Sequence, residues 1–295
     1  MVSRLTALTA VLTLALSPAG PKPFSPFPAS GQLFYQDVSF DRSGETLYLT
    51  RIDGAIHTIV VSRIHAGAWP VPVVVPFSGR WRDLEQVLSP DGRTMIFASN
   101  RPALSGGKPI DAFFGGKRRP ARGGNLWSVA RNATGWGTPV RLPDAVNANT
   151  STFSPALSAD GTLYFMRASG AKQRFHIFVA ERKAGTYPAS APAPFSDVRY
   201  SDFDPAVASD GSFVIFGSNR PPAKKGSADL FIAYHRAGGW TTPRDMGRTL
   251  DGAGDVIEPR LSPDERTLYF TKSTTPNPLW SVDLTPWLAQ TDRGA

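Results

Sequence analysis

The sequence predicts an all-β fold, a single-domain β-propeller built from four-stranded blades. One pattern, an extended segment followed by a tight turn of the Asp-Gly type and a returning apolar segment, occurs five times along the 295 residues. The chain contains 27 glycines and 27 prolines, which suit many short strands separated by turns. Windows with helical periodicity are hard to find. A long-period repeat indicates units that cannot bury their faces alone and must stack on one another.

The fourth copy defines the repeating unit. Residues 203–208 are extended, 209–212 form the tight turn, and 213–217 return as a second strand, because the glycine of the turn tolerates positive φ. Residues 229–234 have the pattern of a third strand. After a glycine turn, 240–246 predict a short outer strand, whose proline is tolerated only at a sheet edge. Four antiparallel strands of this kind form one propeller blade.

The turn position recurs in every copy, so the blades can be counted. It falls at Ser43, Asp91, Asp160, Asp210 and Asp264. Five copies predict five blades, with six blades as the alternative. The predicted blades cover approximately residues 34–76, 83–142, 152–195, 202–247 and 256–284.

The repeat pattern of the last blade ends after its third strand, so another segment must supply the fourth strand. Pro-Phe-Ser precedes the second and fourth blades, and the same triplet stands at residues 23–25, before the first blade. We therefore expect residues 22–28 to supply the outer strand of the last blade and to close the ring. The alternative is that 285–289 fill that place. Either way, 21–288 form one domain, followed by a tail at 289–295.

Residues 1–19 have the pattern of an export signal. Arg4 gives a positive start, 5–16 are apolar, and 17–19 offer small residues for cleavage. An uncharged run of about a dozen residues is short of the ~20 that span a bilayer. We therefore expect a periplasmic or secreted protein without a membrane span. The chain has no cysteine, so neither a disulfide nor a lipid-attachment cysteine is expected.

The chain is basic, with a formal charge of +8. A basic balance favours anionic partners, and export argues against nucleic acid among them. Residues 103–124, the long link of the second blade, form the one large break in the repeat and so the best place for a specific contact. The alternative is a solvated loop. The candidate ligand-binding residues of this link are Phe113, Phe114, Lys117, Arg118, Arg119 and Arg122.

Three segments carry a family resemblance. They are 258–264 (Glu-Pro-Arg-Leu-Ser-Pro-Asp), 267–271 (Thr-Leu-Tyr-Phe-Thr) and 97–102, which ends in Ser-Asn-Arg-Pro. Together they resemble the WD40-like PD40 repeat of the TolB propeller family, and the likeness extends over nearly the whole chain after the export signal. The resemblance implies a propeller scaffold. TolB-like proteins are periplasmic and have six blades and a separate N-terminal domain, whereas this sequence predicts five blades and no such domain.

Alignment of the repeats places one acidic position at the start of each innermost strand. Four carboxylates around the central channel could hold a divalent cation or bind a cationic ligand, and in five-bladed glycosidases such carboxylates act as general acid and base. The structural alternative is that they cap backbone amides or pair with a repeated arginine such as Arg101 or Arg220. Repetition favours that alternative, because catalytic sets are normally asymmetric. The aligned residues are Asp37, Glu85, Ser154, Asp204 and Glu258.

The sequence offers no other catalytic pattern. The four histidines, at positions 57, 65, 176 and 235, have no metal-ligand spacing, and no Gly-x-Ser-x-Gly nucleophile motif occurs. We therefore predict no catalytic residue, no metal site and no cofactor. The favoured hypothesis is a monomeric, exported, non-enzymatic binding module for a protein, a peptide or an anionic glycan. The alternatives are a carbohydrate-active enzyme that uses the channel carboxylates and a module that was once part of a larger sensor or peptidase.

Overall fold

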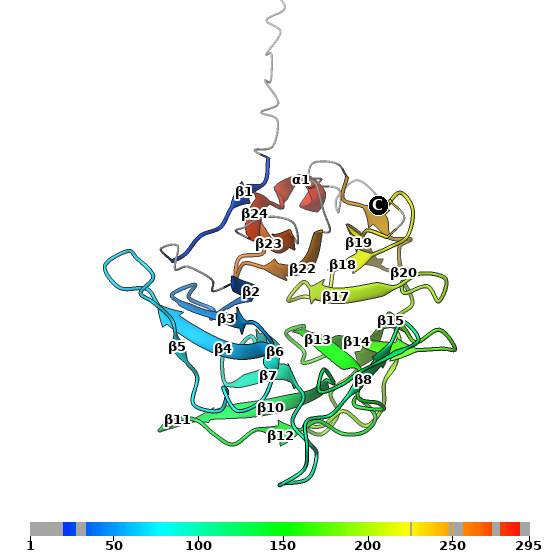
Figure 1. The fold of residues 1–295 in the computed structure, drawn as a ribbon. Helices are drawn as coiled ribbons and strands as arrows, with labels where there is room; N and C mark the ends of the chain where they lie inside the picture. The colour runs from blue at the N-terminus through cyan, green and yellow to red at the C-terminus, as the bar shows by residue number, and fades with distance from the viewer. Residues whose placement is uncertain are drawn as a thin grey trace, which may run out of the picture.

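Five small antiparallel sheets surround a central axis in the computed structural model (Figure 1). The structure describes residues 20–27, 34–224, 226–247, 250, 256–272 and 278–289. The predicted all-β, five-bladed propeller is confirmed. The expected export signal at 1–19 and nearly all of the expected tail lie outside the described residues. Within them, no helix is long and apolar enough to cross a membrane.

Each blade has three long strands and one or two short outer strands. The first blade contains β2 (Phe34–Phe40), β3 (Thr46–Asp53), β4 (Ile56–Arg63) and β5 (Val73–Val74). The second contains β6 (Asp83–Leu88), β7 (Thr94–Ser99), β10 (Asn125–Asn132), β11 (Gly135–Trp136) and β12 (Val140–Arg141). The third contains β13 (Thr152–Leu157), β14 (Leu163–Ser169), β15 (Arg174–Ala180) and β16 (Ala191–Pro192). The fourth contains β17 (Asp202–Val207), β18 (Phe213–Ser218), β19 (Asp229–Arg236), β20 (Gly239–Trp240) and β21 (Arg244–Asp245). The fifth contains β22 (Val256–Leu261), β23 (Thr267–Lys272) and β24 (Leu279–Asp283).

The N-terminal segment completes the fifth blade. Strand β1 (Lys22–Pro23) pairs antiparallel with β24, and Phe24 N–H donates to the Leu279 carbonyl at 2.9 Å. The Phe24 ring lies 4.8 Å from the Tyr269 ring of the same blade. Helix α1 (Thr285–Leu288) follows β24, so the alternative outer segment is helical rather than extended. The two ends of the chain therefore meet in one blade.

The tight turns explain the repeated Asp-Gly pair. In the second blade the Asp91 carboxylate accepts the Arg93 backbone N–H at 3.0 Å, which is the local bond that favours Asp in turns. Gly92 follows at φ +67°, a conformation that a side chain disfavours. The fifth blade is the exception, because Glu265 occupies the glycine position at φ 57°. These turns all lie on one face of the ring, called here the turn face.

The core lies between neighbouring blades. One position in the middle of each second strand is fully buried and apolar, and a buried side chain of this size contributes about 1.5–3 kcal/mol. Since each sheet needs its neighbours to cover it, the ring folds as one unit. The residues at this position are Leu49, Phe97, Phe165, Phe216 and Phe270, none more than 1% exposed.

The long link of the second blade contains a β-hairpin, made of β8 (Ala112–Phe114) and β9 (Lys117–Arg119). It lies over the third blade, where Phe113 N–H donates to Ser151 Oγ at 2.7 Å and Gly115 N–H donates to the Gln173 carbonyl at 2.9 Å (Figure 1). This part of the link therefore folds as a hairpin against the third blade, although strand β9 is exposed to solvent. The hairpin stands on the face where the innermost strands begin, called here the strand-start face.

Candidate functional site

Each innermost strand contains a bulge at the aligned acidic position. The strand register shifts there in all five blades. The residue at each bulge is left-handed, although none is glycine, and this conformation costs about 1–3 kcal/mol. Such residues persist only where surrounding contacts compensate the strain. Their φ values are 56° for Asp37, 56° for Glu85, 46° for Ser154, 52° for Asp204 and 55° for Glu258.

Hydrogen bonds connect these residues from blade to blade. Ser154 N–H donates to Glu85 Oε2 at 2.8 Å, and Ser154 Oγ–H donates to Asp204 Oδ1 at 2.6 Å. The backbone N–H of Glu85 donates to Thr50 Oγ1 of the first blade at 3.1 Å. We call the five bulge residues the acidic ring. Through these bonds the Glu85 and Asp204 side chains join the second and fourth blades to the bulge of the third blade.

Arg260 makes a further connection, between the last blade and the first. Its Nη2 lies 3.0 Å from Asp37 Oδ1, and its Nη1 donates to the Pro259 carbonyl at 2.8 Å. Glu258 Oε2 accepts the Thr271 hydroxyl within the fifth blade at 2.7 Å. A buried guanidinium thus joins the fifth blade to the first.

Burial sets the protonation of the acidic ring. It raises the pKa of Glu85 to about 8, and the charges of Asp37 and Asp204 add to the effect. Burial also raises the pKa of Glu258 well above its ordinary value and raises the pKa values of Asp37 and Asp204. Part of the ring is therefore protonated at neutral pH. Among the described residues, no group of three or more His, Asp or Glu side chains has the arrangement of a metal site.

Two further buried ion pairs lie in the second and fourth blades. Arg101 and Asp83 are 2.7 Å apart, and Arg220 and Asp202 are 2.6 Å apart. The sequence suggested these two arginines as partners for the aligned acids. The structure corrects this detail, because they pair with aspartates at the first position of β6 and β17. The arginine that contacts the ring is Arg260, which the sequence analysis did not single out.

The link of the second blade lies beside the start of β6. Asn100 Oδ1 accepts the Arg82 backbone N–H at 2.9 Å, and Asn100 Nδ2 donates to the Ala121 carbonyl at 2.9 Å. The Phe114 ring packs 5.0 Å from the Phe175 ring of the third blade. These contacts fix the hairpin and the end of the link next to the opening of the channel.

A pocket of about 530 Å³ lies between the hairpin and the acidic ring. It joins Glu85 of the ring to three of the six link residues predicted from the sequence. The other three point elsewhere: Phe113 is 49% exposed, Lys117 is exposed, and Arg118 Nε donates to Asp111 Oδ2 at 2.7 Å. The pocket is lined by Arg82, Leu84, Glu85, Phe114, Arg119, Arg122, Phe153, Met166 and Phe175.

This pocket between the hairpin and the acidic ring, called here the strand-start pocket, has an excess of positive charge. Arg82 Nε is buried without a hydrogen-bond partner in the described part of the chain. Burial, followed by the charges of Arg82 and Arg122, lowers the pKa of the neighbouring His57 to about 3, so His57 is neutral. The Arg119 guanidinium lies 5.1 Å above the Phe114 ring. Three guanidinium groups beside an aromatic wall can bind an anionic group that carries an apolar part.

The sequence analysis missed Arg82, which is the most enclosed cation of the pocket. The equivalent position is Ser151 in the third blade and Ser201 in the fourth. The only sequence signal for Arg82 was therefore that it differs from these residues of the repeat. The predicted ring acids Asp37, Asp204 and Glu258 do not line the strand-start pocket.

Comparison with known proteins finds no matching family model and no matching curated protein. Among solved structures, a putative TolB from Agrobacterium tumefaciens matches with a TM-score of 0.51 and 17% identity, over 81% of this chain and 70% of that one. TolB from Acinetobacter baumannii matches with a TM-score of 0.51 and 12% identity. That match covers 84% of this chain but 54% of TolB, so the chain spans about half the length of that relative.

A thermostable family-43 glycoside hydrolase matches with a TM-score of 0.57 and 11% identity, over 87% of this chain and 90% of that one. At such identities a likeness shows the fold alone, and the same fold carries many functions. The chain is therefore similar in fold to TolB proteins and to a family-43 glycoside hydrolase, as a β-propeller.

Proposed function

We propose that this protein is an exported, non-enzymatic binding propeller, and that its strand-start pocket holds an anionic group of a protein, a peptide or a glycan. One observation carries the proposal. A single pocket of about 530 Å³ is lined by Arg82, Arg119 and Arg122 and by an aromatic wall. Guanidinium groups suit carboxylates, sulfates and phosphates because their planar fork binds two oxygens. The apolar wall adds area for the body of the ligand.

The hydrogen bonds of the acidic ring support a binding role. A glycosidase needs one carboxyl to protonate the leaving group and another to act as nucleophile or base. In this ring Glu85 and Asp204 both bond to Ser154, and Asp37 bonds to Arg260. Carboxyl groups held in this way support the bulge of the third blade and the contact between the fifth and first blades, which is a structural task.

The fold likeness to TolB proteins and the expected signal at 1–19 support export to the periplasm or beyond. A single ring with its ends joined in one blade supports a monomer. Export is tested by the N-terminal sequence of the protein recovered from the native envelope fraction. Recovery of an intact residue 1–19 segment in the cytoplasmic fraction would contradict it.

Binding is tested by titrating two anionic probes, a Glu-rich peptide with one Phe and an oligogalacturonate, into the wild-type protein. The decisive variant is Arg119→Gln/Arg122→Gln. Its control is Lys117→Gln/Arg118→Gln, which makes the same charge change in the same link outside the pocket. A hydrogen bond to a charged group contributes about 1.5–3 kcal/mol, and 1.4 kcal/mol is about tenfold in affinity. We expect the first variant to bind at least tenfold more weakly and the control to bind nearly as well as wild type. Equal losses in both variants would show a diffuse charge effect and refute the pocket.

A carbohydrate-active enzyme is the second candidate, because Glu85 lines the strand-start pocket and burial raises its pKa to about 8. A carboxyl that is protonated at neutral pH can act as a general acid. The test is turnover of a panel of aryl glycosides and acidic polysaccharides by wild type and by Glu85→Gln. Turnover that disappears in Glu85→Gln while binding persists would establish this candidate. Absence of turnover in the wild-type protein, with binding retained, supports the binding module.

A further inference from the structure

Positive charge gathers on one face of the ring. Three connections around the second and third blades reach the strand-start face: residues 75–82 before β6, residues 100–124 between β7 and β10, and residues 169–174 at the turn from β14 to β15. Arg101 is neutralised in a buried ion pair. Besides it, the three connections contain nine lysines and arginines and one acid, Asp111. Their excess of eight positive charges equals the net formal charge of the whole chain, +8.

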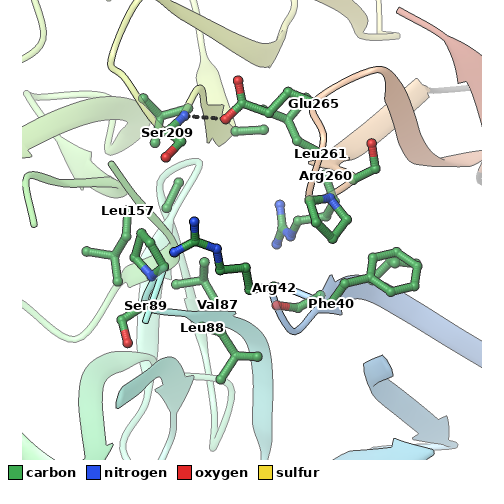
Figure 2. A pocket seen from close by; sticks show the side chains of 18 of the residues that line it. Phe40, Arg42, Val87, Leu88, Ser89, Leu157, Ser209, Arg260, Leu261 and Glu265 are labelled. Carbon is green, nitrogen blue, oxygen red and sulfur yellow. Dashed lines mark hydrogen bonds between the residues drawn. The ribbon is translucent and has the colours of Figure 1, made fainter. Parts of the chain in front are cut away.

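The turn face has the opposite charge. Hydrogen bonds from the Ser89 hydroxyl and the Arg93 backbone N–H lower the pKa of Asp91, so the carboxylate of this turn is charged. In the pocket on this face, Arg42 and Glu265 are a cation and an acid from two of the turns (Figure 2). The acids outnumber the arginines by seven to three in the five tight turns, 41–45, 89–93, 158–162, 208–212 and 262–266. The charges of the two faces therefore give the ring a dipole whose positive end is the strand-start face.

The hairpin β8–β9 belongs to a continuous basic surface. Its tip contacts the turn from β14 to β15, where Gly115 N–H donates to the Gln173 carbonyl at 2.9 Å. That turn contacts the loop before β17, where Arg174 Nη1 donates to the Arg199 carbonyl at 2.7 Å. We call this surface the basic platform, and it consists of residues 112–119, 169–174 and 197–201.

The basic platform keeps a positive charge after its ion pairs are counted. Arg118 pairs with Asp111, and Arg199 pairs with Asp197. The remaining four cations make no ion pair with any residue that the structure describes. These four are Lys117, Arg119, Lys172 and Arg174. Their charge is therefore available to a partner.

Exposed apolar side chains lie on the same face as these cations. Phe113 on the hairpin is 49% exposed, and Val198 in the loop before β17 is 78% exposed. Leu104, in the link of the second blade, is 80% exposed. The five tight turns of the turn face, all within the described residues, expose no large apolar side chain. A single exposed apolar residue is ordinary, so the informative point is that these coincide with the excess of cations.

We propose that the basic platform docks the protein on an anionic lipid bilayer. Its lysines and arginines contact the headgroup phosphates, and Phe113 and Val198 enter the boundary between headgroups and acyl chains. A bilayer offers a planar array of negative charge above an apolar layer, which matches cations and apolar side chains spread over three neighbouring loops. A soluble glycan lacks the apolar layer. The negative turn face favours the same orientation, because an anionic surface repels it.

This docking surface goes beyond the strand-start pocket. Phe113, Lys117, Lys172 and Val198 do not line that pocket, whereas Arg119 does. Variants that change only the first four residues therefore test docking without altering the pocket. Failure of either proposal leaves the other standing.

Flotation with lipid vesicles tests the proposal. One set contains phosphatidylcholine alone, and the other contains equal parts of phosphatidylcholine and phosphatidylglycerol. We expect binding to the anionic vesicles to be at least about tenfold tighter and to weaken as salt screens the surface charges. Equal binding to both sets, or binding to neither, would overturn the proposal. Polyglutamate is the probe for an acidic protein partner, and displacement of the protein from the vesicles by an equal concentration of glutamate charges would overturn the choice of a bilayer.

The first variant tests the charges of the basic platform. Lys117→Gln/Lys172→Gln removes two exposed cations that make no ion pair in the described structure. We expect it to bind anionic vesicles at least about tenfold more weakly, with a shallower dependence on salt. Arg42→Gln/Arg93→Gln, the control, makes the same charge change at exposed positions of the turn face. Equal losses in the two variants would show attraction by net charge alone and refute docking through the platform.

The second variant tests the apolar contact. Phe113→Ser/Val198→Ser keeps every charge of the basic platform. We expect its affinity for anionic vesicles to fall at least about tenfold with an unchanged dependence on salt, because the lost contribution is apolar burial. Val73→Ser/Val74→Ser, the control, makes a comparable change on the exposed outer strand β5. Unchanged affinity in Phe113→Ser/Val198→Ser, or an equal loss in the control, would refute the bilayer contact.

Discussion

Replacement of Glu85 by glutamine should make the protein more stable at alkaline pH. The folded protein holds a proton on Glu85 up to about pH 8, because burial and two neighbouring acids raise its pKa from the ordinary 4.5. The unfolded chain releases that proton near pH 4.5. Between these values the folded state binds more protons, so the free energy of unfolding falls as the pH rises. The contribution is fully present below pH 4.5 and is lost on passing pH 8.

The difference between the pKa of Glu85 in the unfolded chain, 4.5, and in the folded protein, about 8, sets the size of this change in stability. It is about 3.5 pH units, and each unit corresponds to about 1.36 kcal/mol, so the ceiling is about 5 kcal/mol. Glutamine imitates the protonated carboxyl and can still accept the Ser154 backbone N–H. The glutamine side chain has no proton to release, so the free energy of unfolding of the variant does not fall with pH at this position. It also removes a negative charge from the neighbourhood of Asp37 and Asp204.

Urea unfolding at pH 5, 6, 7 and 8.5 measures this effect as the difference in free energy of unfolding between Glu85→Gln and wild type. We expect a difference near zero at pH 5 that grows to several kcal/mol in favour of the variant at pH 8.5. Glu45→Gln, on an exposed turn of the first blade, is the control for the chemical change itself. A difference that is constant with pH, or one that favours wild type at pH 8.5, would refute a protonated Glu85 in the acidic ring.

Three further changes test the scaffold. Arg220→Met leaves Asp202 buried without its cation and should cost about 3–5 kcal/mol in urea unfolding; a loss below 1 kcal/mol would show that the pair is dispensable. Gly124→Ala places a methyl group 2.1 Å from the Phe153 ring and should cost about 1–3 kcal/mol, seen as a lower Tm, with an unchanged Tm contradicting this packing. Phe24→Ala removes the half-buried ring that anchors β1. We expect faster proteolysis at the N-terminal segment, and unchanged cleavage would contradict closure of the ring by β1.

The fold was predictable because the same local sequence signals occur in every blade. The Asp-Gly turn, the apolar second strand and the outer strand are local features, and five copies of them permit little besides a ring. The hairpin β8–β9 was not predictable, since its position depends on contacts with the third blade. Phe113 bonds to Ser151 and Phe114 packs on Phe175, and residues in separate blades show no common pattern in sequence.

The location of the acidic ring was predictable by alignment, but its bonding was not. Alignment shows that Glu85 and Ser154 share a position, yet it cannot show that one accepts a hydrogen bond from the backbone of the other. It also cannot show the left-handed backbone, because glutamate and serine rarely adopt it. The same is true of Arg260, whose partner Asp37 lies at the opposite end of the chain.

The departures of the ring from five-fold symmetry follow from its charge. Five buried carboxylates side by side would repel one another strongly, and burial alone already favours their neutral forms. Ser154 reduces the number to four and donates its hydroxyl proton to Asp204, while Arg260 supplies a cation for Asp37. The remaining charge is removed by protons, as the pKa of about 8 for Glu85 indicates.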